Sequence, residues 1–350
     1  MDGSTFTAHI SYYDYPFAPA TNETDPPILR VWTELRPYLL TKGYEIPEDI
    51  TAPWLGSLYL GGEEDVIPKD GSNAIRAKRR SDAAPVIVKI IMQPSRELAI
   101  HQYLLSFEHP HNHTVPIIDS FPFIRYTGDQ YLDWMIIVEP MIHKRFIDYS
   151  LVQLHGEVLV GIRQALEGLA FMHLHHVAHG DICIPNMYYM SGTTFKHGIP
   201  AHPAAPSWAS RVWRPWRLFY LDFGLSVKLA DDASRSCVPY RGGVIVPPEV
   251  LACKNARKPL VCDPFAADVY RLGRVLRDTS MLLDPENDTF YLVALGFPEG
   301  ISTLLEHMTH EEPERRPSVH ECLRLFHTET QVTTPRHTLF RILACHDSLG

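Results

Sequence analysis

The chain has 350 residues, of which 45% are hydrophobic and 21% are charged, a composition typical of a globular protein rather than a disordered chain. Its 32 basic and 41 acidic residues give a net charge of -9, so no sequence-independent binding to nucleic acid is expected. There is no apolar leader and no run of about 18 apolar residues, so we expect neither secretion nor a membrane span.

The six cysteines are scattered without a CxxC pair, which is typical of a reducing compartment. We therefore expect a cytoplasmic protein, with the nucleus as the other possible compartment. Four of the 19 histidines crowd into FMHLHHVAHGD at residues 171–181. No HExxH motif or matching Cys/His spacing accompanies them, so a zinc site is disfavoured.

The first 50 residues are expected to form an N-terminal arm with a short packing helix outside the main domain. After Asp25-Pro26-Pro27, apolar residues recur at helical spacing, at Ile28, Val31, Trp32 and Leu35. Pro37 should break or restart this helix, and Gly43 should end it.

Two segments rich in Val and Ile predict buried strands, at residues 84–92 and 134–140. Residues 157–176 instead place apolar side chains on one helical stripe, which predicts a long core-facing helix. The helical pattern returns at residues 269–276 and 319–326. Because strands come first and helices follow, the sequence predicts an α+β fold with two lobes.

The segment HGDICIPN at residues 179–186 follows the long helix, and the apolar strand RLFYLDFG comes after it. Phosphoryl transfer from a nucleotide explains this pairing. One carboxylate must orient the acceptor hydroxyl, for which Asp181 is the candidate. An amide oxygen and a second carboxylate must hold magnesium, a role for Asn186 and Asp222. Lys89, with Glu97 available to hold it, supplies a charge anchor for the nucleotide.

The order of these motifs resembles the eukaryotic protein kinase family over most of residues 55–327. In chain order they are VIVK, a helical Glu, VEPM as a hinge, HxDxxxxN, DFG, PPE in place of APE, DVYRLG and PERRPS. The run WRPWRLFYLDFGLS resembles most closely the divergent kinase-like chains of fungi. The resemblance implies a bilobal protein kinase-like fold, with a small β-rich N-lobe and a larger helical C-lobe.

By this resemblance, residues 51–141 form the N-lobe and hinge, and residues 142–330 form the C-lobe. The C-lobe carries an irregular insertion near residues 191–215, where Gly, Pro and Ser recur every few residues. A C-terminal tail, residues 331–350, follows.

The resemblance also implies ATP and Mg²⁺ as cofactors, with transfer of the γ-phosphoryl group to Ser or Thr of a protein substrate. The adenine edge would meet backbone groups of Glu139 and Met141, after Val138 as the gatekeeper. Asp181 would carry the acid-base work.

Three structural roles follow from the same resemblance. His179 would brace the Phe of DFG, Asp268 would brace the backbone of the catalytic loop, and Glu249 would pair with Arg316.

Several positions depart from the family pattern. Only Gly71 and Ser72 remain of the glycine-rich phosphate loop, so the grip on the nucleotide should be weaker. Gly180 replaces the usual Arg, and we therefore expect no need for phosphorylation of the activation segment. Cys183 and Gly242 replace the Lys and Thr of Ser/Thr kinases, which indicates a remodelled acceptor site.

Two alternative functions stay open. One is a pseudokinase, a nucleotide-binding or scaffolding module without turnover. The other is a small-molecule kinase of the aminoglycoside or choline type, which also has HGD in this loop. Against the latter, the motifs PPE, DVYRLG and RRPS belong to the C-lobe of protein kinases. The sequence does not identify the acceptor or the oligomeric state.

Overall fold

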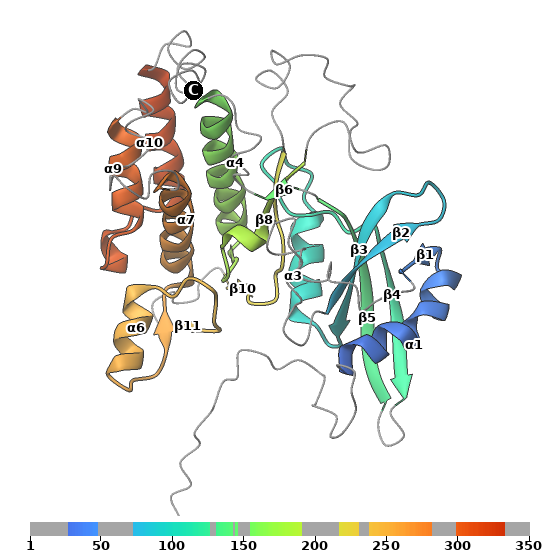
Figure 1. Ribbon diagram of the computed structural model, residues 1–350. Helices are drawn as coiled ribbons and strands as arrows, with labels where there is room; N and C mark the ends of the chain where they lie inside the picture. The colour runs from blue at the N-terminus through green and yellow to red at the C-terminus, as the bar shows by residue number, and fades with distance from the viewer. Residues whose placement is uncertain are drawn as a thin grey trace, which may run out of the picture. The chain divides into compact units, whose positions relative to one another are not determined.

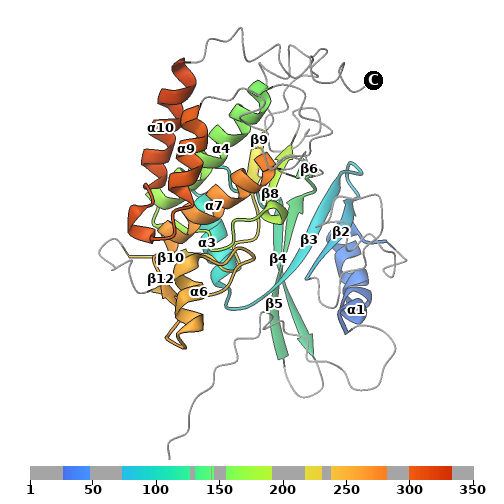
Figure 2. The same cartoon turned by 60° about the vertical axis from the view of Figure 1, so that its left-hand side comes forward.

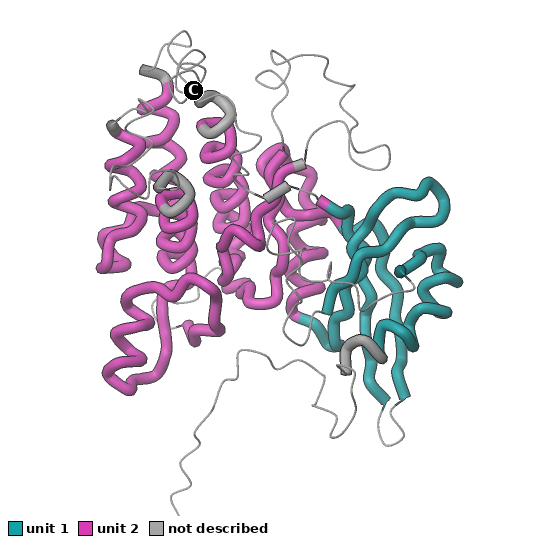
Figure 3. Tube along the Cα trace, viewed as in Figure 1, with its two compact units in different colours: residues 1–95, 117–141 teal, residues 96–116, 142–350 magenta. Residues whose placement is uncertain are grey.

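The computed structural model describes residues 27–47, 73–126, 131–142, 144–145, 155–190, 217–230, 238–281 and 299–332. These residues form a mixed α+β structure with a five-stranded antiparallel sheet and seven α-helices (Figure 1). The predicted α+β class is confirmed at this level. The chain divides into two compact units (Figure 3): unit 1 is residues 1–95 and 117–141, and unit 2 is residues 96–116 and 142–350.

Unit 1 is built on the five-stranded sheet. Its strands, in spatial order, are β1 (Tyr44–Glu45), β2 (Ala74–Arg79), β3 (Pro85–Met92), β5 (Tyr131–Pro140) and β4 (Asp119–Tyr126). The Val- and Ile-rich segments expected at residues 84–92 and 134–140 are confirmed as β3 and as the second part of β5. Branched side chains favour strands because they pack well on a pleated surface.

Helix α1 (Pro27–Thr41) belongs to the core of unit 1 instead of standing outside it. Its buried residues are Val31, Trp32, Leu35 and Leu39. Pro37 does not break the helix, and apolar side chains are buried on both sides of it, so their packing outweighs the cost of the proline. Gly43 follows the helix with φ of +87°, as expected for a residue that ends one.

Unit 2 is mainly helical. Its helices are α3 (Arg96–Leu105), α4 (His155–Leu174), α6 (Pro248–Asn255), α7 (Pro264–Met281), α9 (Glu299–Met308) and α10 (Val319–Val332). Helix α10 packs against α4 and α9, and α7 packs against α9 (Figures 1 and 2). The three helical patterns are confirmed as α4, α7 and α10, with a shared apolar core. No helix in the described part of the chain is both long and apolar enough to cross a bilayer.

Residues 96–116 belong to unit 2, although the sequence places them in the N-lobe. The reason is packing, because Ile100 and Leu104 of α3 are buried in the apolar core that α4, α7 and α10 share.

Short strands and turns of unit 2 flank residues 179–186 and 222–224. Strands β6 (Lys144–Arg145), β8 (Met187–Met190) and β9 (Arg217–Tyr220) form one sheet, β7 (Val177–Ala178) pairs with β10 (Val227–Lys228), and β11 (Val238–Pro239) pairs with β12 (Val261–Cys262). Two 3₁₀ turns occur at Ile184–Asn186 and Pro313–Arg315. The predicted insertion near 191–215, the remnant Gly71-Ser72 and the tail 331–350 fall outside the described residues, apart from the last two residues of α10.

Candidate active site

The candidate site is centred on two segments of unit 2 that strand pairing brings together. Residues 179–186 follow β7, and residues 222–226 precede β10, its antiparallel partner. The Leu221 N–H also donates to the Asn186 carbonyl over 3.0 Å. This pairing explains how residues about 40 positions apart in the sequence come to share one site.

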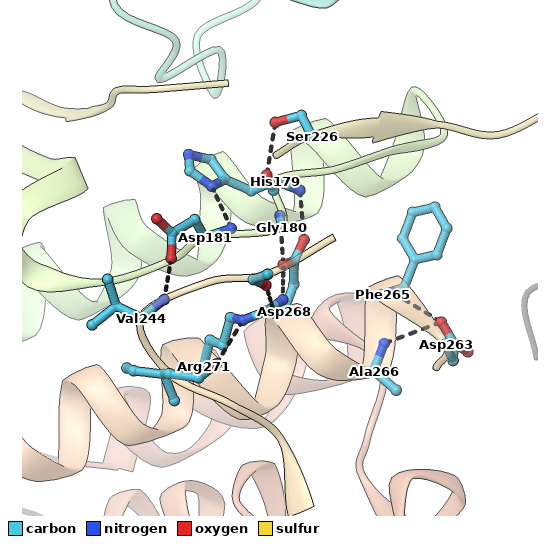
Figure 4. A network of polar contacts seen from close by, with 12 residues as sticks. His179, Gly180, Asp181, Ser226, Val244, Asp263, Phe265, Ala266, Asp268 and Arg271 are labelled. Atoms are coloured by element: carbon cyan, nitrogen blue, oxygen red, sulfur yellow. Dashed lines mark hydrogen bonds and ion pairs between the residues drawn. The ribbon is translucent and has the colours of Figure 1, made fainter. Parts of the chain in front are cut away.

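Asp268 on α7 holds the backbone of the first segment. Its carboxylate is fully buried and accepts the N–H of His179 at 2.6 Å and of Gly180 at 3.0 Å (Figure 4). His173 and Arg271 each lie 3.4 Å from the same carboxylate. Burial alone would raise the pKa of Asp268, but the hydrogen bond and charge of His173, with Arg271, hold it below its usual value. The predicted brace is confirmed.

His179 is a neutral core residue in a single tautomer. Its Nε2 lies 3.0 Å from the Leu221 carbonyl, and its Nδ1 lies 3.2 Å from the backbone N–H of Asp181. A carbonyl can only accept and an amide N–H can only donate, so Nε2 carries the proton and Nδ1 accepts. Burial lowers the pKa of His179. Its ring centroid lies 5.3 Å from that of Phe223, which confirms the predicted contact with the Phe of DFG.

Asp181 is held by three contacts. Its Oδ1 accepts the backbone N–H of Val244 at 2.7 Å, and its Oδ2 accepts Asn186 Nδ2 at 3.1 Å. The Asn186 amide also donates to the Asp181 carbonyl at 2.9 Å. Burial raises the pKa of Asp181 and the charge of Asp222 adds to this rise, while the Val244 N–H opposes it.

Asn186 and Asp222 have the donor chemistry for magnesium. Both hydrogens of the Asn186 amide point to Asp181, which leaves the amide oxygen as its available acceptor. Asp222 has φ of +62°, and its charge acts on both His179 and Asp181. Mg²⁺ takes few protein oxygens and completes its shell with water and phosphate, so one amide and one carboxylate fit it.

Glu97, at the start of α3, lies at the DFG turn. A β-carbon on Gly224 would be 3.6 Å from Glu97 Oε2. Lys89, its predicted partner, belongs to unit 1, where it lies in β3 opposite Ile137 of β5.

The predicted hinge residues Val138, Glu139 and Met141 are all in unit 1. Val138 is fully buried in the apolar core of α1 and the sheet, one position away from Ile137, the pairing partner of Lys89. Because neighbouring residues of a strand point to opposite faces, Ile137 shares the face of Lys89 and Val138 does not. Met141, whose backbone groups are expected to meet adenine, donates its N–H to the Pro85 carbonyl over 3.3 Å.

Two of the departures from the kinase pattern have a physical basis in the fold. Gly180 has φ of +84°, and a β-carbon there would overlap the carbonyl oxygen of Leu225. Cys183 is buried, and burial raises the pKa of its thiol, so it stays uncharged where the family carries a lysine.

The predicted pair between Glu249 and Arg316 is confirmed. Arg316 contacts the carboxylate through two nitrogens, at 2.6 and 3.0 Å. It also donates to backbone carbonyls of Ala266, His310 and Glu311. A bidentate guanidinium of this kind fixes the start of α6 to the turn before α10.

Sequence reasoning missed three contributors, namely Gly243, Val244 and Arg271. Arg271 stands three residues after Asp268 in DVYRLG, so helical spacing could have placed the two side chains on one face. No comparable signal marks Val244, because it acts through its backbone N–H.

Comparison with protein-family models and with curated proteins found no match to this chain.

Proposed function

We propose that this chain is an ATP-dependent kinase that transfers the γ-phosphoryl group to a Ser or Thr hydroxyl of a protein. The proposal rests on the chemistry of Asp181, Asn186 and Asp222 and on the order of the sequence motifs around them. Mg²⁺ bound by Asn186 and Asp222 would neutralise the charge of the nucleotide phosphates.

In the proposed reaction, the acceptor oxygen forms a bond to the γ-phosphorus, and the bond from that phosphorus to the bridging oxygen breaks. ADP leaves with the bonding electron pair, and the acceptor proton passes to the Asp181 carboxylate. Lys89 is the proposed anchor of the nucleotide phosphates.

The observation that carries the proposal is the double contact of Asn186 with Asp181. One amide holds the carbonyl and the carboxylate of the proposed base, and this directs the amide oxygen away from it. The Asn186 amide is buried, the Asp181 carboxylate is partly exposed, and the charge of Asp222 raises the pKa of Asp181. Acidic groups with perturbed pKa values of this kind are concentrated at functional sites.

The first prediction separates the two carboxylates. Asp222→Asn should weaken magnesium-dependent ATP binding at least about 10-fold, because it removes a charge that acts in the ground state. Asp181→Asn should leave ATP binding within about 2-fold and remove transfer, because the base acts only as the reaction proceeds. Calorimetry with ATP and Mg²⁺ measures binding, and labelled phosphate on casein measures transfer.

Asp263→Asn is the matched control. Its side chain accepts the N–H groups of Phe265 and Ala266 at the start of α7, a role that asparagine also fills (Figure 4). Equal loss of ATP binding in Asp181→Asn and Asp222→Asn would contradict the division of roles. Binding of ATP by the parent without any transfer would favour the pseudokinase, and transfer to an aminoglycoside or choline alone would favour the small-molecule kinase.

A further inference from the structure

Arg271 is a buried cation that the proposed reaction does not use directly. Its side chain is 2% exposed, although it lies on α7 within reach of the candidate site. A guanidinium is costly to bury unless its N–H groups find acceptors. The acceptors that Arg271 contacts therefore indicate its structural role.

The contacts of Arg271 bracket one backbone amide. Its Nη2 donates to the Gly242 carbonyl and its Nε to the Ile245 carbonyl, each over 3.0 Å. Val244 lies between these two residues, and its N–H donates to Asp181 over 2.7 Å (Figure 4). The guanidinium thus fixes the chain on both sides of the group that holds the proposed base.

The third contact of Arg271 joins it to the anchor of the catalytic loop. Its Nη1 lies 3.4 Å from Asp268, which accepts the N–H groups of His179 and Gly180. One side chain therefore links both backbone segments that flank Asp181. The planar fork of a guanidinium can make these contacts together, whereas a lysine ammonium is a single point charge.

Gly243 allows residues 242–245 to approach Asp181 closely. Its φ is +125°, and a β-carbon there would lie 2.9 Å from the Gly180 carbonyl oxygen and 3.2 Å from Asp181 Oδ1. Any other residue would push the segment away from the carboxylate.

We infer that Arg271 is a positioning residue, which sets the orientation of Asp181 through the Val244 N–H. This inference rests on the proposed function, in which Asp181 is the base. Where the kinase resemblance implies a Lys and a Thr at the acceptor site, this chain has Cys183 and Gly242. The Asp181 carboxylate is instead contacted by the Asn186 amide and by the Val244 N–H, and Arg271 holds the segment that carries this N–H.

The test compares Arg271→Lys and Gly243→Ala in the full-length chain, with Arg274→Lys on the same helix as control. Arg274 donates to the Tyr270 hydroxyl, one turn earlier on α7, over 3.3 Å. For both test variants we expect kcat for transfer to casein to fall at least about 10-fold, with KM and the Kd for ATP and Mg²⁺ within about 2-fold. Hydrogen exchange of the Val244 amide, followed by NMR, should become at least about 10-fold faster.

The inference is overturned if the kcat and the Val244 exchange rate of both test variants match those of Arg274→Lys. If Arg271→Lys loses its cooperative thermal transition, Gly243→Ala still tests whether the position of the Val244 segment sets kcat, and an unchanged kcat and Val244 exchange rate in that variant overturn the inference. A parent protein without transfer would contradict the proposed function only. In that case the exchange rate still decides whether Arg271 holds Val244 against Asp181.

Discussion

At the scale of single residues, the backbone conformation at Gly180 explains why this position has no side chain. Its left-handed φ of +84° and the closeness of the Leu225 carbonyl leave no room for a side chain. The absence of an arginine here is therefore part of how residues 179–186 pack against Leu225, and an arginine cannot simply be restored.

Gly180→Ala should be more destabilising than Gly43→Ala. Both positions have nearly the same φ, +84° and +87°, so both variants should lose about 1 to 2 kcal/mol from left-handed strain. Nothing lies within 4 Å of a β-carbon on Gly43, whereas one on Gly180 meets the Leu225 backbone and should cost about 1 to 3 kcal/mol more. Denaturant unfolding measures both, and equal losses would show that the contact is relieved at no cost.

At the scale of elements, the pairing of β3 with β5 decides which side chain shares a face with Lys89. The register sets Lys89 against Ile137 and Val88 against Val138. Val138 then belongs to the core that includes α1, and Ile137 shares the face of the sheet that carries Lys89.

Ile137→Ala and Val138→Ala should therefore change different properties, ligand affinity and stability respectively. Val138→Ala should lower the free energy of unfolding by about 2 kcal/mol through a cavity beside α1, with ATP affinity unchanged. Ile137→Ala should raise the affinity for a purine analogue with a bulky N6 substituent, because it removes volume on the face of Lys89. Binding of that analogue and chemical unfolding are the two measurements. If Val138→Ala alone admits the analogue, the gatekeeper is Val138, as the motif order predicts.

The sequence was most informative where two motifs contain residues that contact each other. Asp268, His179 and the pair of Glu249 and Arg316 were predicted because motif order fixes which residues meet. It was least informative where contacts depend on tertiary structure. The Val244 N–H belongs to the backbone and has no signature of its own.

Two features at the scale of elements could not be predicted from the sequence, for the same reason. The place of α3 in unit 2 depends on what Ile100 and Leu104 pack against, which periodicity alone does not reveal. The engagement of the Met141 N–H with Pro85 depends on strand register. A strand shifted by one residue would have the same composition but expose the opposite face.

At the scale of the whole molecule, buried histidines make stability sensitive to acid. His113 is buried, and its Nδ1 donates to the Leu218 carbonyl at 2.8 Å. Burial lowers its pKa to about 4, and the charges of Arg217, His111 and Arg163 act in the same direction. Burial also lowers the pKa of His175, His179 and His320.

Below pH 6.5, His113 becomes protonated in the unfolded chain but stays neutral in the folded chain until the pH reaches about 4. The free energy of unfolding should therefore fall as the pH drops from 6.5 to 4. The drop from an ordinary value of 6.5 corresponds to a loss of about 3 kcal/mol. His113→Asn keeps a donor for Leu218 without titrating, so its unfolding curve should lack this part of the acid dependence. Identical acid dependence in parent and variant would assign the loss to other groups.

The anchoring of the His179 and Gly180 backbone by Asp268 has a consequence for synthesis on the ribosome. His179 and its anchor are 89 residues apart in the chain. At about 5 to 20 residues per second, translation reaches Asp268 roughly 5 to 20 s after His179. Throughout that interval the nascent loop carries two amide groups whose permanent acceptor does not yet exist. The candidate site therefore cannot reach its final form before α7 is made, and a translational pause before α7 would prolong its exposure to chaperones and proteases.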